Sequence, residues 1–241
     1  ALGIYVAVLY AWGETYLPTS SVKYGIVTDS TGLSMGLRNG DKILSVDNQP
    51  VDNFMQITAD ILLNNRKTIQ VEREGTKVDI QIPAEVIPLM LKGKGLIEPR
   101  TPFGPFVISA FGKESPASDA GILLNDELVG LDNIRFAWYD EFQTYLAEHK
   151  DETVTVNVVR EGETVNIPVR TTLSGTLGVG SSRSYENLFE LKTVRYGFLE
   201  SIPAGISKGF RTMGDYLKQF RLIFSRHTKA YESLGGFITI G

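Results

Sequence analysis

The chain has 241 residues, of which 42% are hydrophobic and 22% are charged, and its formal net charge at neutral pH is −4. It contains no cysteine, which excludes disulfide bonds, metal–thiolate sites and a thiol nucleophile. The acidic balance, together with the lack of a nucleic-acid recognition motif, argues against a nucleic-acid partner.

The first residues, Ala1 to Trp12, are apolar and uncharged. This run is shorter than the roughly 20 residues that cross a bilayer, and it lacks the charged start of a signal peptide. The aromatic residues Trp12 and Tyr16 suit a lipid headgroup zone. We therefore predict that residues 1–18 are the end of a transmembrane helix, so that the chain is a fragment of a longer protein. A buried core helix is the alternative.

The segment 36–47 has a counterpart in the segment 121–132. Each begins with a glycine that allows a left-handed turn and continues through a polar turn that ends in aspartate. An alternating apolar strand and a second polar turn follow in both. The separation of the two segments suits a duplicated small domain better than a solenoid repeat.

The flanks of these two segments also repeat in one order. Each segment is followed by a predicted amphipathic helix and then by a predicted hairpin with a Glu-Gly turn. The helices contain Ile57 and Ile61 in the first copy and Phe142 and Leu146 in the second, and the hairpins span residues 69–82 and 154–169. We therefore predict two copies of one small, mostly β domain, at residues 19–100 and 101–182.

The repeated pattern resembles the PDZ family in its bacterial arrangement. Ser115–Ile122 matches the opening of the family pattern closely, and Ser30–Leu37 matches it loosely. Gly40-Asp41 keeps the Gly-Asp pair of the family, whereas Asn125-Asp126 has lost the glycine. The resemblance implies an α+β fold with two tandem PDZ-like, partly open β-barrels.

PDZ domains bind an extended peptide as an added strand, and backbone N–H groups hold its terminal carboxylate. The resemblance implies that the loops 93–97 and 175–179 supply these N–H groups, because glycine lets the backbone turn there. The implied peptide-binding residues are Leu177, Gly178, Val179, Phe142 and Leu146 in the second domain, and Gly95, Leu96, Ile97, Ile57 and Ile61 in the first. The alternative is that they are ordinary turn glycines and core residues.

Residues 183–232 are predicted to form a linker and a long amphipathic helix. Its basic residues, such as Lys208 and Lys218, face away from the apolar sector. Such a helix can lie on an anionic membrane surface, dock on partner helices or pack on the preceding domains. We predict the lipid surface, because the apolar segment 233–241 follows. The apolar positions are Leu199, Ile202, Ile206, Phe210, Met213, Leu217, Phe220 and Phe224.

The segments Lys192–Gly197 and Ser233–Ile240, with the long helix between them, look like the region after the PDZ pair in the site-2 protease family, of the regulator of sigma-E protease type. Phe237 stands where that family usually has proline. The resemblance implies that residues 233–241 begin the next membrane segment of a zinc intramembrane protease. It also implies a bacterial inner-membrane protein whose PDZ domains lie on the periplasmic side.

No catalytic or metal-binding residues are predicted within the chain itself. His149 and His227 are its two histidines, and they lack the His-Glu-x-x-His spacing that places two imidazoles around zinc. A Ser-His-Asp triad is not predicted either. The resemblance implies that zinc is a cofactor of the parent protein and not of this fragment.

The predicted function is that of the extracytoplasmic PDZ tandem of such a protease. The tandem would act as a size filter, or would recognise a peptide or C-terminus of a membrane-protein substrate above the active site. Its folded domains would exclude a bulky ectodomain and admit a short stub. The alternatives are a membrane-anchored peptide-binding scaffold without protease activity and the PDZ pair of a periplasmic serine protease.

Overall fold

The computed structural model describes residues 2–92 and 95–223. The predicted membrane segment at 233–241, Phe224 and His227 lie outside the described residues. The chain divides into two compact units: unit 1 comprises Ala1–Pro99 and Phe189–Gly241, and unit 2 comprises Arg100–Leu188. Residues 183–188 of the predicted linker therefore belong to unit 2, and the long helix belongs to unit 1.

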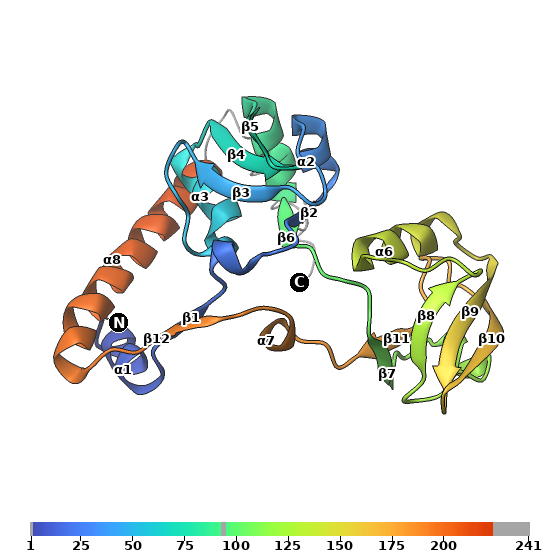
Figure 1. Ribbon diagram of the computed structural model, residues 1–241. Coiled ribbons are helices and arrows are strands. Elements are labelled where there is room, and N and C mark those ends of the chain that lie inside the picture. Colours follow the sequence, from blue (N-terminus) through green and yellow to red (C-terminus); the bar gives the residue numbers. More distant parts are fainter. Residues whose placement is uncertain (1, 93–94, 224–241) are drawn as a thin grey trace, which may run out of the picture. The chain divides into compact units, whose positions relative to one another are not determined.

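Unit 2 is a five-stranded sheet with helical connections, drawn from green through yellow to orange in Figure 1. The strand order is β10-β9-β8-β7-β11, with antiparallel neighbours, so the sheet is open and has β10 and β11 as its edges. The elements are β7 (Phe106–Phe111), α5 (Pro116–Asp119), β8 (Glu127–Leu131), α6 (Tyr139–Glu148), β9 (Thr153–Arg160), β10 (Glu163–Arg170), β11 (Val179–Ser181) and α7 (Tyr185–Leu188).

Short sequence signals account for the turns of unit 2. Ser115 caps α5 by accepting a hydrogen bond from the Ser118 N–H, and proline takes the first helical turn. The β9–β10 hairpin turns at Glu161-Gly162, where both residues have positive φ, as a tight hairpin turn requires. Because the strands alternate, their inward side chains and those of α6 form one core. Its large members include Phe103, Phe106, Ile108, Leu128, Phe142, Leu146, Val156, Val158 and Leu177.

Unit 1 contains the same order of elements as unit 2, with additions at both ends. Strand β2, helix α2, strand β3, helix α3, the β4–β5 hairpin and strand β6 follow one another as β7 to β11 do in unit 2. The bounds are α1 (Leu2–Trp12), β1 (Glu14–Tyr16), η1 (Thr19–Ser21), β2 (Ile26–Thr28), α2 (Ser30–Met35), β3 (Lys42–Val46), η2 (Phe54–Gln56), α3 (Ile57–Asn64), β4 (Thr68–Arg73), β5 (Thr76–Gln81), η3 (Ala84–Val86), α4 (Ile87–Lys92), β6 (Ile97–Pro99), β12 (Lys192–Val194) and α8 (Phe198–Ile223).

The strands of unit 1 are arranged differently from those of unit 2. β3, β4 and β5 form a three-stranded sheet, while β2 and β6 pair separately. The short helix α4 stands between β5 and β6, where unit 2 has a loop. A two-stranded sheet of β1 and β12 joins the segments that precede and follow the repeated elements. As in unit 2, the strands do not close into a barrel.

The same ion pair joins corresponding elements in both units. In unit 2, Arg160 donates two hydrogen bonds of 2.8 and 2.7 Å to the buried carboxylate of Asp126 and one of 2.9 Å to the carbonyl of Gly121. In unit 1, Arg73 makes the same three bonds, to Asp41 and to the glycine at the equivalent position. The fork of an arginine fits a carboxylate in this bidentate way. The pair therefore ties the end of one hairpin strand to the turn before β8 or β3.

Helix α8 packs on α1 through small residues. Ser201, Gly205 and Gly209 are buried on that side, and a Cβ added at Gly205 would lie 2.6 Å from the backbone nitrogen of Val6. α8 runs from α1 at one end to α3 at the other (Figure 1), where Lys218 donates to Asn64. Among the described helices, none has both the length and the apolar content that a membrane span needs. The assignment of residues 1–18 to a transmembrane helix stays a prediction.

Replacing Arg160 with leucine should destabilise unit 2 by about 2–3 kcal/mol, because Asp126, 2% exposed, would lose its cation. Arg170→Leu on the same hairpin is the matched control. Its pair with Asp151 is 69% and 48% exposed, so the loss of stability should be clearly smaller. Urea unfolding followed by Trp138 fluorescence, in a Trp12→Phe background, measures both. Equal losses would contradict the role of the buried pair.

The destabilisation by Arg160→Leu should also depend on pH. The hydrogen bonds from Arg160 hold the pKa of Asp126 below its ordinary value of 3.8. The stabilisation from a lowered carboxyl pKa is present above the unfolded-state value and is lost as the pH falls through the folded-state value. The difference between the two proteins should therefore be largest near neutral pH and shrink below about pH 4.

Two glycines of α8 should respond oppositely to alanine. Gly214→Ala meets no atom within 4 Å and should stabilise the helix by about 0.5–1 kcal/mol, because alanine is the better helix former. Gly205→Ala should push α1 away and raise the hydrogen-exchange rates of the α1 amides. If the α1 amides exchange alike in the two variants, the close packing of these helices is wrong.

Candidate functional site

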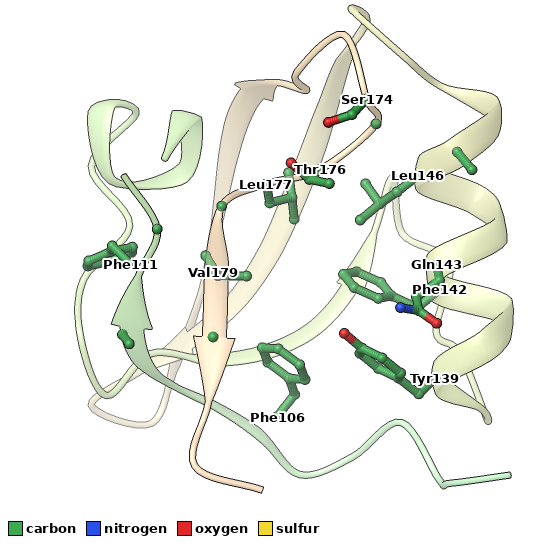
Figure 2. A pocket seen from close by; sticks show the side chains of 16 residues that line it. Phe106, Phe111, Tyr139, Phe142, Gln143, Leu146, Ser174, Thr176, Leu177 and Val179 are labelled. Atoms are coloured by element: carbon green, nitrogen blue, oxygen red, sulfur yellow. The ribbon is translucent and has the colours of Figure 1, made fainter. Parts of the chain in front are cut away.

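A pocket of about 620 Å³ lies in unit 2 between the edge strand β11 and helix α6 (Figure 2). Its floor is built from core side chains, so its shape is set by the packing of the unit. The lining residues are Phe106, Ala110, Phe111, Gly112, Tyr139, Phe142, Gln143, Leu146, Ala147 and Ser174 to Gly180. Phe111 lies on the side of β11 away from α6, and the other labelled side chains lie between the strand and the helix (Figure 2).

The pocket is apolar at its base and uncharged throughout. Phe106, Phe142, Leu146 and Leu177 are between 2% and 5% exposed. None of the described residues that line the pocket carries a charge. Its side-chain polar groups come from Gln143 and Tyr139 of the helix and from two hydroxyls of the loop before β11. An apolar side chain therefore suits this pocket and a charged one does not.

The loop before β11 is held in one conformation by Thr172. Its backbone N–H donates to the carbonyl of Thr176, its carbonyl accepts from the N–H of Gly175, and its hydroxyl oxygen accepts from the N–H of Thr176, all at 2.9–3.0 Å. Gly175 has a φ of +71° and approaches α6 so closely that a Cβ would lie 2.4 Å from the carbonyl oxygen of Leu146. The loop is thus packed against the C-terminal half of α6.

Two backbone amides of this loop are available to a ligand. The carbonyl of Leu177 accepts from the Ala117 N–H at 3.1 Å, and the carbonyl of Gly178 accepts from the Gly112 N–H at 2.9 Å. The N–H groups of Leu177 and Gly178 themselves donate to no acceptor in the described part of the chain. Adjacent N–H groups of this kind form a site for an anion such as a carboxylate.

Strand β11 continues this site as a sheet edge. It pairs with β7 on one side, and no described strand lies on its other side, toward α6. A peptide in extended conformation can therefore add to β11 as a further strand. The pocket, the free amides and the edge lie along one groove.

The predicted site residues of the second domain come together in this groove. Leu177, Gly178, Val179, Phe142 and Leu146 all line the pocket. Sequence analysis missed Phe106, Tyr139, Gln143 and Ala147. The helical spacing from Phe142 and Leu146 could have found Tyr139 and Gln143, since positions three and four apart share one face. Phe106 gave no comparable signal, because its strand approaches the helix only in the folded unit.

Peptide binding by the predicted residues of the first domain stays a prediction. Ile57, Ile61 and Leu96 are fully buried in unit 1. Leu96 is also the counterpart of Gly178, because its carbonyl accepts from the Asp29 N–H just before β6 begins at Ile97. Gly95, with a φ of +139°, therefore stands one residue before the position that corresponds to Gly178. The described part of unit 1 thus places these residues in its core or at its turn.

Gly178 cannot accept a side chain. Its φ is +71°, and a Cβ would lie 2.2 Å from the carbonyl oxygen of Glu114 and 2.5 Å from the Cα of Ser115. Any substitution there would displace the loop, so it would change the fold together with binding. Variants that test binding belong on exposed positions of α6 instead.

The described residues contain no group of three histidine, cysteine or acidic side chains that could hold a metal ion. His149 ends α6, where its Nδ1 lies 2.8 Å from the carbonyl oxygen of Tyr145 and its ring stacks on that tyrosine. The tyrosine hydroxyl donates to Asp132 at 2.8 Å. His149 is thus part of the contacts that end the helix.

Comparison with protein families gives a match to the PDZ domain over residues 96–171. The match includes β7 to β10 and α6, the elements that form the floor and helical wall of the groove. The chain contains a PDZ domain. The groove of unit 2 therefore lies largely within this PDZ domain, and β11 and the loop before it complete the groove beyond the matched residues.

Curated relatives of the chain differ in their names. A Rhizobium meliloti protein named "Putative zinc metalloprotease" is 27% identical over 146 residues, 56% of this chain and 38% of its own length. Glutamate receptor-interacting protein 2 of Xenopus laevis is 26% identical over 247 residues, 90% of this chain and 22% of its own length. The periplasmic pH-dependent serine endoprotease DegQ of Escherichia coli is 26% identical over 160 residues, 60% of this chain and 35% of its own length. The chain thus spans less than two fifths of each relative.

Proposed function

We propose that unit 2 binds the free C-terminus of an extended peptide. The observation that carries this proposal is the pair of unpartnered N–H groups, of Leu177 and Gly178, at the mouth of an uncharged apolar pocket beside the sheet edge β11. Charge-assisted hydrogen bonds from such amides hold a carboxylate. The general peptide-binding role of PDZ domains supports the proposal.

The groove favours a large apolar last residue. The terminal side chain would enter the pocket beside Phe142, Leu146 and Leu177, and its burial is worth about 1.5–3 kcal/mol. The preceding residues would pair with β11, with alternate side chains facing α6. We assign C-terminal binding to unit 2, because the pocket and the free amides lie together there.

We further propose that unit 1 is a second, divergent PDZ copy. Its order of elements and its Arg73–Asp41 pair, which matches Arg160–Asp126, support common ancestry of the two units. Unit 1 differs from unit 2 in that its strands form separate sheets and that helix α4 is inserted between β5 and β6. Its role would be structural, as the base on which α1 and α8 are mounted.

We also propose that α8 lies on a membrane surface. Its apolar sector is left uncovered in the described structure, with exposed fractions between 38% and 78%. The small residues, and not this sector, face α1. Aromatic and aliphatic side chains beside basic ones suit an anionic lipid surface. The exposed side chains are Leu199, Ile202, Ile206, Phe210, Met213, Leu217 and Phe220.

For the whole protein we propose a zinc intramembrane protease of the bacterial inner membrane, with this chain on its periplasmic side. The likeness to the Rhizobium meliloti protein and the order of the sequence motifs support this proposal. The zinc and catalytic residues would belong to the rest of that protein, and its substrate would be a membrane protein. The alternatives are a membrane-anchored scaffold and a periplasmic serine protease. The likeness to glutamate receptor-interacting protein 2 relates to the first alternative, and the likeness to DegQ relates to the second.

The C-terminus proposal is tested at two exposed positions of α6. Ala147→Trp would fill the pocket with its indole and should weaken binding of a short peptide that ends in leucine at least about tenfold. Thr144→Trp, on the same helix but outside the pocket, should leave the affinity within about twofold. Calorimetric titration measures both. Amidation of the peptide C-terminus should weaken binding as strongly as Ala147→Trp, and equal affinity of the amidated peptide would sink the proposal.

The role in the whole protein is tested by deleting residues 19–182 from the full-length protein. A filter above the active site excludes substrates by size, so its removal should allow cleavage of a substrate that still carries its folded ectodomain. Immunoblotting of that substrate in cells is the measurement, with a pre-shortened substrate as the control for activity. An ectodomain-bearing substrate that stays intact while the short one is cut would contradict the filter.

A further inference from the structure

The end of the groove that lies away from the free amides is aromatic, and a cation stands just beyond it. The rings of Phe106 and Tyr139 stack there, with centroids 6.1 Å apart and planes 11° from parallel. The guanidinium of Arg183 donates to the carbonyls of Phe103 and Pro102 at 2.6 and 2.5 Å. Because the ring of Phe103 stacks on Phe106 at 5.8 Å, these bonds fix Arg183 next to the groove's end.

Arg183 has no carboxylate partner in the described part of the chain. Its side chain is half-buried, burial lowers the pKa of the guanidinium, and the ionisable neighbour that acts on it is Tyr139. An arginine nonetheless stays protonated near neutral pH. The acidic residues at the start of α6, Asp140 and Glu141, are paired with Arg100. A guanidinium has five N–H donors, so the two carbonyls leave donors for a further acceptor.

Strand geometry gives the peptide position that lies level with Arg183. If the terminal carboxylate sits on the free amides, a peptide antiparallel to β11 has its last residue beside Val179. The residue two earlier then lies beside Ser181, and the residue four earlier lies level with Arg183. Four residues of strand span about 13 Å. The stretch of α6 from Tyr139 to Ala147 rises about 12 Å, so the same span leads from the pocket to the aromatic end.

We propose that Arg183 binds an acidic side chain of the peptide about four residues before its free C-terminus. The inference rests on the proposed peptide binding by unit 2 and deepens it. The ligand class becomes an extended peptide with a free carboxylate, a large apolar last residue and an aspartate or glutamate about four positions upstream. A guanidinium forms charge-assisted hydrogen bonds with such a carboxylate. The peptide thus supplies a carboxylate partner that Arg183 lacks in the described part of the chain.

The same geometry disfavours a basic residue at that position. A lysine or arginine side chain there would meet the half-buried guanidinium with like charge and little water to screen it. Arg183 would therefore discriminate between peptides in both directions. Because the contact is partly exposed, the preference for glutamate over glutamine should be about three- to tenfold and should decrease as salt is added.

The experiment compares four affinities by calorimetric titration of the full chain. The proteins are the wild type and Arg183→Gln, whose side-chain amide can still donate to the carbonyls of Pro102 and Phe103. The peptides end in leucine and carry glutamate or glutamine four residues before the end. The wild type should bind the glutamate peptide about three- to tenfold more tightly, and Arg183→Gln should bind both peptides within about twofold. A glutamate preference that survives in Arg183→Gln would overturn the proposal.

Three controls separate the possible failures. If Arg183→Gln does not fold, as judged by Trp138 fluorescence, then Arg183→Lys, which keeps the charge, replaces it and should retain part of the preference. In the wild type the preference should shrink between about 50 and 500 mM salt, and a salt-independent preference would count against an ion pair. If the wild type binds both peptides equally well and amidation abolishes binding, this inference alone is wrong. If amidation changes nothing, the proposed function is wrong.

Discussion

The groove of unit 2 depends on one close approach, that of Gly178 to the backbone of Glu114 and Ser115. No Cβ fits in that space, so the residue is glycine and its backbone is left-handed. In this conformation the carbonyls of Leu177 and Gly178 point into the unit and accept hydrogen bonds from Ala117 and Gly112. Their N–H groups are left for a ligand. The free amides, the start of β11 and the edge it presents to α6 all follow from that placement.

The two units share the bonds that build the fold and differ in the loop that would bind a ligand. The buried Arg–Asp pair is repeated with the same three hydrogen bonds in each. At the counterpart of Gly178, unit 1 has Leu96, whose side chain is fully buried and whose carbonyl also accepts from the Thr28 hydroxyl at 2.8 Å. A leucine at this position uses its side chain for the core. The buried ion pair is thus present in both units, whereas the position of Gly178 in unit 2 is occupied by a leucine in unit 1.

The sequence predicted those features that depend on near neighbours in the chain. The turns at Glu161-Gly162, the amphipathic face of α6 with Phe142 and Leu146, and the mixed PDZ-like fold follow from local spacing and from the family pattern. The one-residue offset between Gly95 and Gly178 could not be predicted from the sequence. A glycine in a loop does not reveal from which residue its carbonyl accepts a hydrogen bond. The contact of Gly205 with Val6 joins residues from opposite ends of the chain, so periodicity in α8 alone could not reveal it.

Arg183 illustrates the same limit and also shows how specificity can arise in such a groove. Its partners, Pro102 and Phe103, precede it by about 80 residues, and their carbonyls have no signature in the sequence. A carboxylate site alone accepts any C-terminus, and an apolar pocket alone distinguishes side chains weakly, since each methylene contributes about 0.8 kcal/mol. A second charged contact about 13 Å along the strand adds a requirement that most C-termini do not meet. Recognition then depends on the distance between the terminal carboxylate of the peptide and its acidic side chain. The groove fixes the distance between the two sites that bind these charges, and a peptide in extended conformation can match it.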